Sequence, residues 1–116
     1  KGAQSSARDA ERKADLEDMR SSFEIFRADC GVYPAESEVT AGQILQKLCA
    51  GATNTYMSQV PADPGRGTTR YEYSVSGSTY TICAKLENSS TTLFNCGGNN
   101  AKNCNGGGCN YSVRNP

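Results

Sequence analysis

The clearest pattern along the chain is a stripe of apolar residues within a strongly charged segment, residues 5–30. Leu16, Met19, Phe23 and Phe26 follow one another at steps of three and four residues. Because an α-helix turns once every 3.6 residues, this spacing places all four side chains on one side of a helix. The pattern therefore predicts one long amphipathic helix whose apolar stripe is covered by the rest of the chain.

The end of this helix is marked in the sequence, whereas its start is not. Gly31 lies where a left-handed residue commonly closes a helix, and Pro34 cannot continue it. No capping box precedes the charged segment, so we expect the helix to begin upstream of this chain. Pairs of opposite charge, such as Asp9/Lys13, lie along the polar side. Each pair is worth only ~0.2–0.5 kcal/mol, so packing of the stripe decides where the helix docks.

The strongest strand signal lies in residues 70–86. Tyr71, Tyr73 and Val75 alternate with polar residues, Gly77-Ser78 favours a turn, and apolar and polar residues alternate again over residues 79–86. The two runs predict an antiparallel hairpin with one apolar face suited to the helix stripe. A helix packed on such a sheet is an α+β arrangement.

Two strands are too few for independent stability, so a third strand is needed. We expect it from residues 91–96, with a further short strand around Tyr111 and Val113. The whole chain is then a single α+β domain, with a long N-terminal helix packed on a small antiparallel sheet and disulfide-stapled C-terminal loops. Its parts are the helix (5–30), a connecting loop (31–69), the sheet (70–96) and a Cys/Gly/Asn-rich C-terminal region (97–116).

The connecting loop contains one further helical pattern. Ile44, Leu45 and Leu48 give residues 41–49 an apolar face, and Gly51 is placed to end a short helix there. The rest of this segment is expected to be loop. Its Val-Pro-Ala-Asp-Pro-Gly run, residues 60–65, predicts an extended approach followed by a turn, because each proline restricts itself and the residue before it.

Six cysteines and no His favour a disulfide framework in an oxidising compartment. A thiolate zinc site is the weaker alternative, since no two cysteines are spaced as C-x2-C and no His is present as a ligand. Closeness in sequence favours the pairs Cys30 with Cys49, Cys83 with Cys96, and Cys104 with Cys109. Interleaved pairings of the last four cysteines remain open, because sequence alone cannot choose among them.

Charge and residue types argue against several classes of function. Twelve Lys and Arg balance twelve Asp and Glu, so overall charge gives no reason to expect a nucleic-acid partner. Without His there is no Ser/His or Cys/His pair, and the carboxylates are mostly spread along the helix, so we expect no enzyme and no cofactor. No Asp or Glu follows Glu87, which disfavours a calcium site in the C-terminal loops.

Taken together, these segments resemble bacterial type IV pilins and type II secretion pseudopilins. The run ARDAERKADLEDMRSSFEIFRADCGVYP looks like the exposed half of their long N-terminal helix, which ends in an acidic residue, a glycine and Tyr-Pro. Asp29, Gly31 and Tyr33-Pro34 occupy those positions. The Pro-x-Asp-Pro segment at residues 61–64 and the tyrosine-rich strands after it complete the resemblance.

This resemblance implies a structural subunit of a filament, acting by polymerisation. Subunits of the family start with an apolar helix that anchors them in the inner membrane before assembly. No such helix is present here, so we expect this chain to begin partway along it. The implied partners are other copies in a helical filament, with minor pilins and the assembly machinery. Candidate filament contacts on the charged helix are Arg8, Glu11, Arg12 and Asp15.

Two readings within the family and one outside it remain. A type IV pilin of a cell-surface filament, serving adhesion, motility or DNA uptake, is our first expectation, and the major pseudopilin of type II secretion is the second. The family member usually linked to calcium uses acidic ligands near its C-terminus, and this chain lacks them. A small secreted disulfide-rich binding module or adhesin is the alternative of another class.

Overall fold

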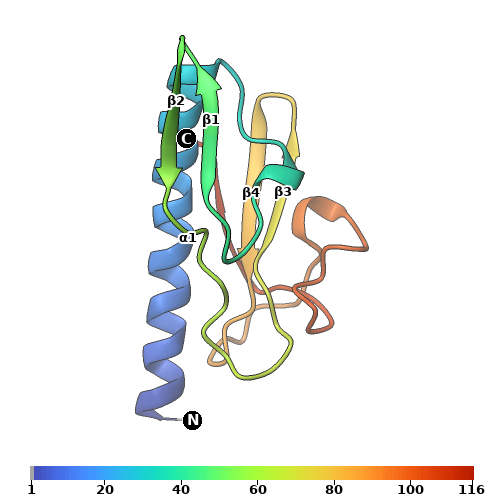
Figure 1. Cartoon of the computed structure of the whole chain (residues 1–116). Helices are drawn as coiled ribbons and strands as arrows, with labels where there is room; N and C mark the ends of the chain where they lie inside the picture. The colour runs from blue at the N-terminus through green and yellow to red at the C-terminus, as the bar shows by residue number, and fades with distance from the viewer. Residues whose placement is uncertain (1) are drawn as a thin grey trace.

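The computed structural model describes residues 2–116 and is an elongated body with principal extents of 48 × 27 × 23 Å (Figure 1). One long helix runs along its whole length, and a small sheet and a hairpin pack against it. The elements in chain order are α1 (Ala3–Cys30), the 3₁₀ turn η1 (Glu36–Glu38), β1 (Leu45–Cys49), β2 (Ala52–Met57), β3 (Glu72–Ser76), β4 (Thr79–Ala84), the 3₁₀ turn η2 (Cys96–Gly98) and β5 (Tyr111–Arg114). The α+β fold class is confirmed.

Helix α1 packs as its apolar spacing predicts. All four stripe residues are buried, and their neighbours are tyrosine and aliphatic side chains of the sheet. The ring of Phe23 lies 4.8 Å from that of Tyr73 and 5.6 Å from that of Tyr80, centroid to centroid. Gly31 ends the helix in the left-handed conformation, and its N–H donates to the carbonyl of Arg27 at 2.8 Å. Among the described residues, no side chain caps the start, where Gly2 precedes Ala3.

The predicted hairpin of residues 70–86 is present as β3 and β4. The strands pair antiparallel with Ser76 opposite Thr79, so Gly77 and Ser78 form the two-residue turn. Tyr73, Tyr80 and Ile82 face α1 and are buried there.

The third strand of the sheet is not the one that we expected. Residues 91–96 make only an isolated bridge, between Phe94 and Cys109, whereas β5 pairs antiparallel with β4 and places Val113 opposite Ile82. The sheet order is β3-β4-β5. Val113 extends the apolar face above α1, which explains why the C-terminal strand, with its alternating pattern, takes this place.

The short helix expected at residues 41–49 is also wrong. Residues 45–49 are strand β1, which pairs antiparallel with β2 through a two-residue turn at Ala50 and Gly51, both with positive φ (54° and 81°). This is the pattern of the tight hairpin turn whose twist suits two strands. Leu45 is buried in the core, but Leu48 is 68% exposed, so the supposed apolar helix face does not exist. The connecting loop therefore contains a second, two-stranded sheet.

The C-terminal loops lie on the side of the sheet away from α1, which gives the molecule three layers (Figure 1). Glu72 and Cys83, which point away from the helix, are buried under this third layer. Its approach is very close at Gly97, where a Cβ atom would lie 2.2 Å from the Oγ of Ser74. Only glycine fits there, since Gly97 also has a φ of 64°.

Candidate functional site

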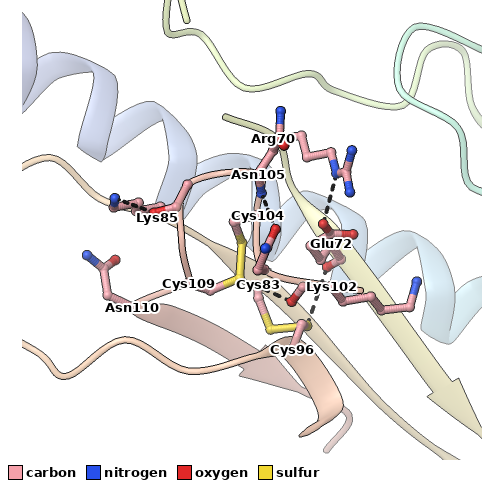
Figure 2. The surroundings of a disulfide bond; sticks show 12 residues. Arg70, Glu72, Cys83, Lys85, Cys96, Lys102, Cys104, Asn105, Cys109 and Asn110 are labelled. Carbon is pink, nitrogen blue, oxygen red and sulfur yellow. Dashed lines mark hydrogen bonds and ion pairs between the residues drawn. A yellow bond between two sulfur atoms is a disulfide. The ribbon is translucent and has the colours of Figure 1, made fainter. Parts of the chain in front are cut away.

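Three disulfides hold this structure together: Cys30 with Cys49, Cys83 with Cys96, and Cys104 with Cys109. These are the pairs that closeness in sequence favours. The first ties the end of α1 to the end of β1. The other two are fully buried and lie next to each other (Figure 2). Phe94 packs against them. Because all six cysteines are oxidised, none is left as a thiolate ligand for zinc.

Two lysines make polar contacts at the C-terminal loops, Lys85 just after β4 and Lys102 within the loops. The ammonium of Lys85 donates a hydrogen bond to the carbonyl of Gly106 at 2.7 Å (Figure 2). On the other edge of the same layer, Lys102 forms an ion pair with Glu36 at 3.0 Å. Calcium requires several oxygen ligands that include carboxylates, and the loops after Glu87 have no carboxylate side chain. The donor set of these loops therefore does not fit a calcium ion.

A buried arginine on α1 gathers three carboxylates from three segments. The guanidinium of Arg12 donates to both carboxylate oxygens of Asp63, at 2.9 and 3.0 Å. It also donates to Asp9 and to Glu87, each at 2.8 Å. The residue is only 2% exposed, so this is an interior ion cluster rather than a surface pair. It fixes the N-terminal half of α1 to two loops that are 51 and 75 residues away in sequence.

The turn at residues 61–65 is built to present Asp63 to this arginine. One oxygen of Asp63 accepts the backbone N–H of Gly65 at 2.7 Å, which closes the turn that the two prolines prepare. The side chain of Asp63 is 2% exposed. A Cβ atom on Gly65 would lie 2.9 Å from Nη2 of Arg12, so glycine lets the turn approach the guanidinium.

Asp9 and Glu87 complete the cluster from the other side. The carboxylate of Asp9 accepts the backbone N–H groups of Glu87 and Asn88, at 2.8 and 2.9 Å. Burial alone would raise the pKa of Asp9, but these backbone donors and Arg12 outweigh it and lower the pKa. Hydrogen bonds from Arg8 and Arg12 lower the pKa of Glu87 to about 2. Asp9 and Glu87 are therefore both ionised at neutral pH.

The candidate filament contacts fall into different environments. The prediction of Arg12 as a surface contact is wrong, because its side chain is buried and forms an ion pair with Asp63 inside the molecule. Arg8 is partly exposed and pairs with Glu87 at 2.6 Å. Asp15 is half-buried and accepts the hydroxyl of Tyr71 at 2.7 Å. Glu11 is exposed, and no ion pair within residues 2–116 involves it.

Tyrosine hydroxyls hold further carboxylates of α1, a feature that sequence reasoning missed. Tyr80 donates to Glu24 at 2.9 Å, and Tyr56 donates to Asp29 at 2.7 Å. With Tyr71 and Asp15, these contacts run along the length of the helix. Several carboxylates of the helix are thus bonded to the sheets. The expected pair Asp9/Lys13 is not formed within residues 2–116, where the ion pairs inside the helix are Arg12 with Asp9 and Arg20 with Glu17, at 2.8 and 3.6 Å. The signal was available in the tyrosines that recur in the strands.

Within residues 2–116, no helix combines the length and the apolar character needed to cross a bilayer.

One of the three comparisons with known proteins found a match, the comparison with protein-family models. Searches of curated proteins and of solved structures found no match. The family model of type II secretion system protein G matches residues 1–106, which is most of the chain. The long helix, the antiparallel sheet and the disulfide-bonded loops agree with this match, and the chain belongs to the family of type II secretion system protein G, the major pseudopilin.

Proposed function

We propose that this chain is the repeating subunit of a periplasmic type II secretion filament and works by polymerising with other copies of itself. The observation that carries the proposal is the match of residues 1–106 to the protein G family. That family consists of structural subunits, and its members assemble with other pseudopilins and with the secretion machinery. The match favours the pseudopilin reading over the type IV pilin reading that we placed first.

The shape of the molecule supports this role. Helix α1 runs past the sheet at its N-terminal end, so the first turns of the helix stand free of the strands (Figure 1). An apolar helix preceding α1 would then anchor the subunit in the inner membrane and pack in the filament core after assembly. The minor pseudopilins and the assembly machinery are its other proposed partners.

The test is to delete the gene in the source organism and restore it with the full-length coding sequence. If the proposal is right, deletion abolishes export of type II substrates into the medium, and restoration recovers it. Overproduction of the full-length protein should yield filaments that contain it. Unchanged export together with loss of surface pili, twitching or adhesion would overturn the proposal in favour of a type IV pilus.

A further inference from the structure

A polar groove lies beside the first turns of α1. Its lining comes from the helix, from the turn after Pro64 and from the segment after β4: Gln4, Arg8, Arg12, Gly65, Arg66, Gly67, Thr69, Lys85, Leu86, Glu87 and Asn88. Its volume is about 680 Å³, which is large enough for a small polar ligand. Four of the lining residues are cationic and one is acidic. The lining therefore favours an anionic occupant.

Two of the four cations are available to such an occupant. Arg8 and Arg12 are paired with the carboxylates already described. Lys85 donates to the neutral carbonyl of Gly106. Arg66 is exposed, and neither Arg66 nor Lys85 takes part in an ion pair within residues 2–116. With the three carboxylates of the ion cluster, four cations stand against three anions, so the site has a net charge of +1.

The groove lies at the end of the molecule where α1 begins. The turn after Pro64 and the segment after β4 are both found at this end (Figure 1). Hydrogen bonds hold them there, since Asn88 donates to Ser5 at 3.1 Å and Arg12 donates to Asp63 at 2.9 Å. Because an α-helix rises 1.5 Å per residue, Arg12 lies only about 14 Å from the start of the helix.

An apolar helix that continues α1 into a membrane would bring a bilayer surface to this end of the molecule. Lipid headgroups extend about 5–8 Å beyond the hydrocarbon core on each side. Membrane helices tilt by about 20° on average, and a tilt toward the groove lowers the exposed guanidinium of Arg66 toward the headgroups. An anionic surface attracts each nearby Lys or Arg about fivefold, and this attraction falls off within about 10 Å.

We propose that the groove binds the headgroup of an anionic phospholipid, with Arg66 and Lys85 as the groups that hold its phosphate. This inference rests on the proposed function, in particular on the anchoring helix, and adds a membrane contact of the subunit before assembly. The occupant is a bilayer lipid rather than free phosphate, because the anchor keeps the groove beside headgroups at a high local concentration.

The contact fixes which side of the subunit faces the bilayer. The groove opens on one side of α1, so binding of a headgroup tilts the sheet and the disulfide-bonded loops toward the membrane on that side. The net charge of +1 and the exposure of Arg66 keep the contact weak and sensitive to salt. A weak contact suits a subunit that leaves the bilayer when it enters the filament.

The test uses the full-length protein, with one copy in each lipid nanodisc so that no filament forms. Discs of phosphatidylcholine alone are compared with discs of equal parts phosphatidylcholine and phosphatidylglycerol. Hydrogen exchange of the backbone amides in residues 65–69 should be about fivefold slower in the anionic discs. The difference should fall below about twofold in about 0.5 M salt, because salt screens exposed charges.

Arg66→Gln removes the net positive charge of the site and should also reduce the difference between the discs to less than about twofold. The side chain is exposed, so the thermal midpoint should stay unchanged. Arg114→Gln is the matched control. It changes an exposed cation outside the groove, opposite Thr81 and away from the Lys85 end of β4, and should keep the fivefold difference.

The outcomes separate this inference from the proposed function. Equal exchange in the two kinds of disc, or a difference that survives Arg66→Gln, overturns the lipid contact and leaves the filament role standing. Equal slowing in neutral discs by about 10 mM inorganic phosphate at matched ionic strength would overturn the lipid as its source, because the groove would then bind a soluble anion. Export that persists without the gene overturns the proposed function but not the lipid contact. A full-length protein that does not insert into the discs removes the anchor, and both then fail.

Discussion

The two sides of the central sheet are held by different chemistry. On the α1 side, apolar and aromatic side chains form a continuous core that includes Phe23, Phe26 and Tyr80. On the other side, the buried cluster consists of four half-cystines, with Phe94 packed against them. The first layer is stabilised by removal of apolar surface from water, which scales with the area buried. The second buries little apolar surface, so covalent links and backbone hydrogen bonds must order it.

The two layers should therefore tolerate substitutions to different degrees. A layer ordered by disulfides can vary its surface residues freely, provided that the cysteines and the close approach at Gly97 are kept. A layer ordered by close packing responds to the loss of even one methylene group. The four predictions that follow either disturb one layer alone or cut the connection between them.

The largest effect is expected in the apolar layer. Phe23→Ala removes a fully buried ring that contacts Tyr73 and Tyr80, and it should lower the free energy of unfolding by about 3–5 kcal/mol. Urea unfolding followed by circular dichroism measures this. Ile25→Ala, at a position that is 58% exposed on the same helix, is the control and should change stability by less than about 0.5 kcal/mol. Similar losses for the two variants would contradict the assignment of this core.

The next effect concerns the ion cluster that links α1 to the loops. Arg12→Met leaves Asp63 and Asp9 without their cation, and removal of one partner from a buried pair costs about 3 kcal/mol or more. Arg8→Met is the matched control, because Arg8 and its partner Glu87 are each about one-third exposed and solvent weakens such a pair, so its loss should cost far less. If Arg12→Met proves no more harmful than Arg8→Met in urea unfolding, the cluster does not fasten the helix.

The apolar stripe around Phe23 and the ion cluster around Arg12 differ in whether the sequence predicts them. The stripe around Phe23 was predictable because helical periodicity is local and needs only four residues. The hairpin of β3 and β4 was predictable for the same reason, since alternation and the Gly77-Ser78 turn lie within one short segment. The cluster around Arg12 was not, because its carboxylates are 51 and 75 residues away and nothing in a local pattern selects them.

The helix expected at residues 41–49 was wrong because the same local pattern is compatible with a helix and with a hairpin. Ile44, Leu45 and Leu48 suit one helix face, and a positive φ at Gly51 suits both a helix end and a hairpin turn. The β-favouring residues Thr55 and Tyr56 were the signal that could have decided for the hairpin of β1 and β2. For the third strand, proximity in sequence favoured residues 91–96. The pairing of β5 with β4 depends on how the disulfide-bonded loop returns the chain.

The third prediction acts on the sulfur layer alone. Replacing both Cys83 and Cys96 by alanine opens a link across 13 residues, whose contribution is about 2–3 kcal/mol in the chain-entropy account. In hydrogen exchange, residues 88–110 should lose protection while α1 keeps it, because the helix is held by the apolar core. Replacing Cys30 and Cys49 instead should free the hairpin of β1 and β2 and leave residues 88–110 protected. Equal loss of protection in α1 after removal of Cys83–Cys96 would show that the layers are not independent.

The smallest effect is a dependence on pH that belongs to the helix side. Burial, and then the hydrogen bond to Asp15, raise the pKa of Tyr71 above its ordinary value of 10. Stability from the neutral hydroxyl is therefore fully present below pH 10 and is lost as pH rises from there toward the folded-state pKa. Tyr71→Phe should cost about 1 kcal/mol at neutral pH and reduce the fall in stability between pH 9 and about pH 11.

The matched control for that variant is Tyr111→Phe, because in residues 2–116 the hydroxyl of Tyr111 makes none of the hydrogen bonds that hold helix carboxylates. Its removal should leave the alkaline limb of the stability curve unchanged. The measurement is urea unfolding at a series of pH values, followed by far-ultraviolet circular dichroism. Identical alkaline limbs for wild type and Tyr71→Phe would mean that the bond to Asp15 does not hold α1 on the sheet. Because no tyrosine lies between residues 85 and 110, the alkaline transition should begin in the helix layer while the disulfide-bonded loops stay ordered.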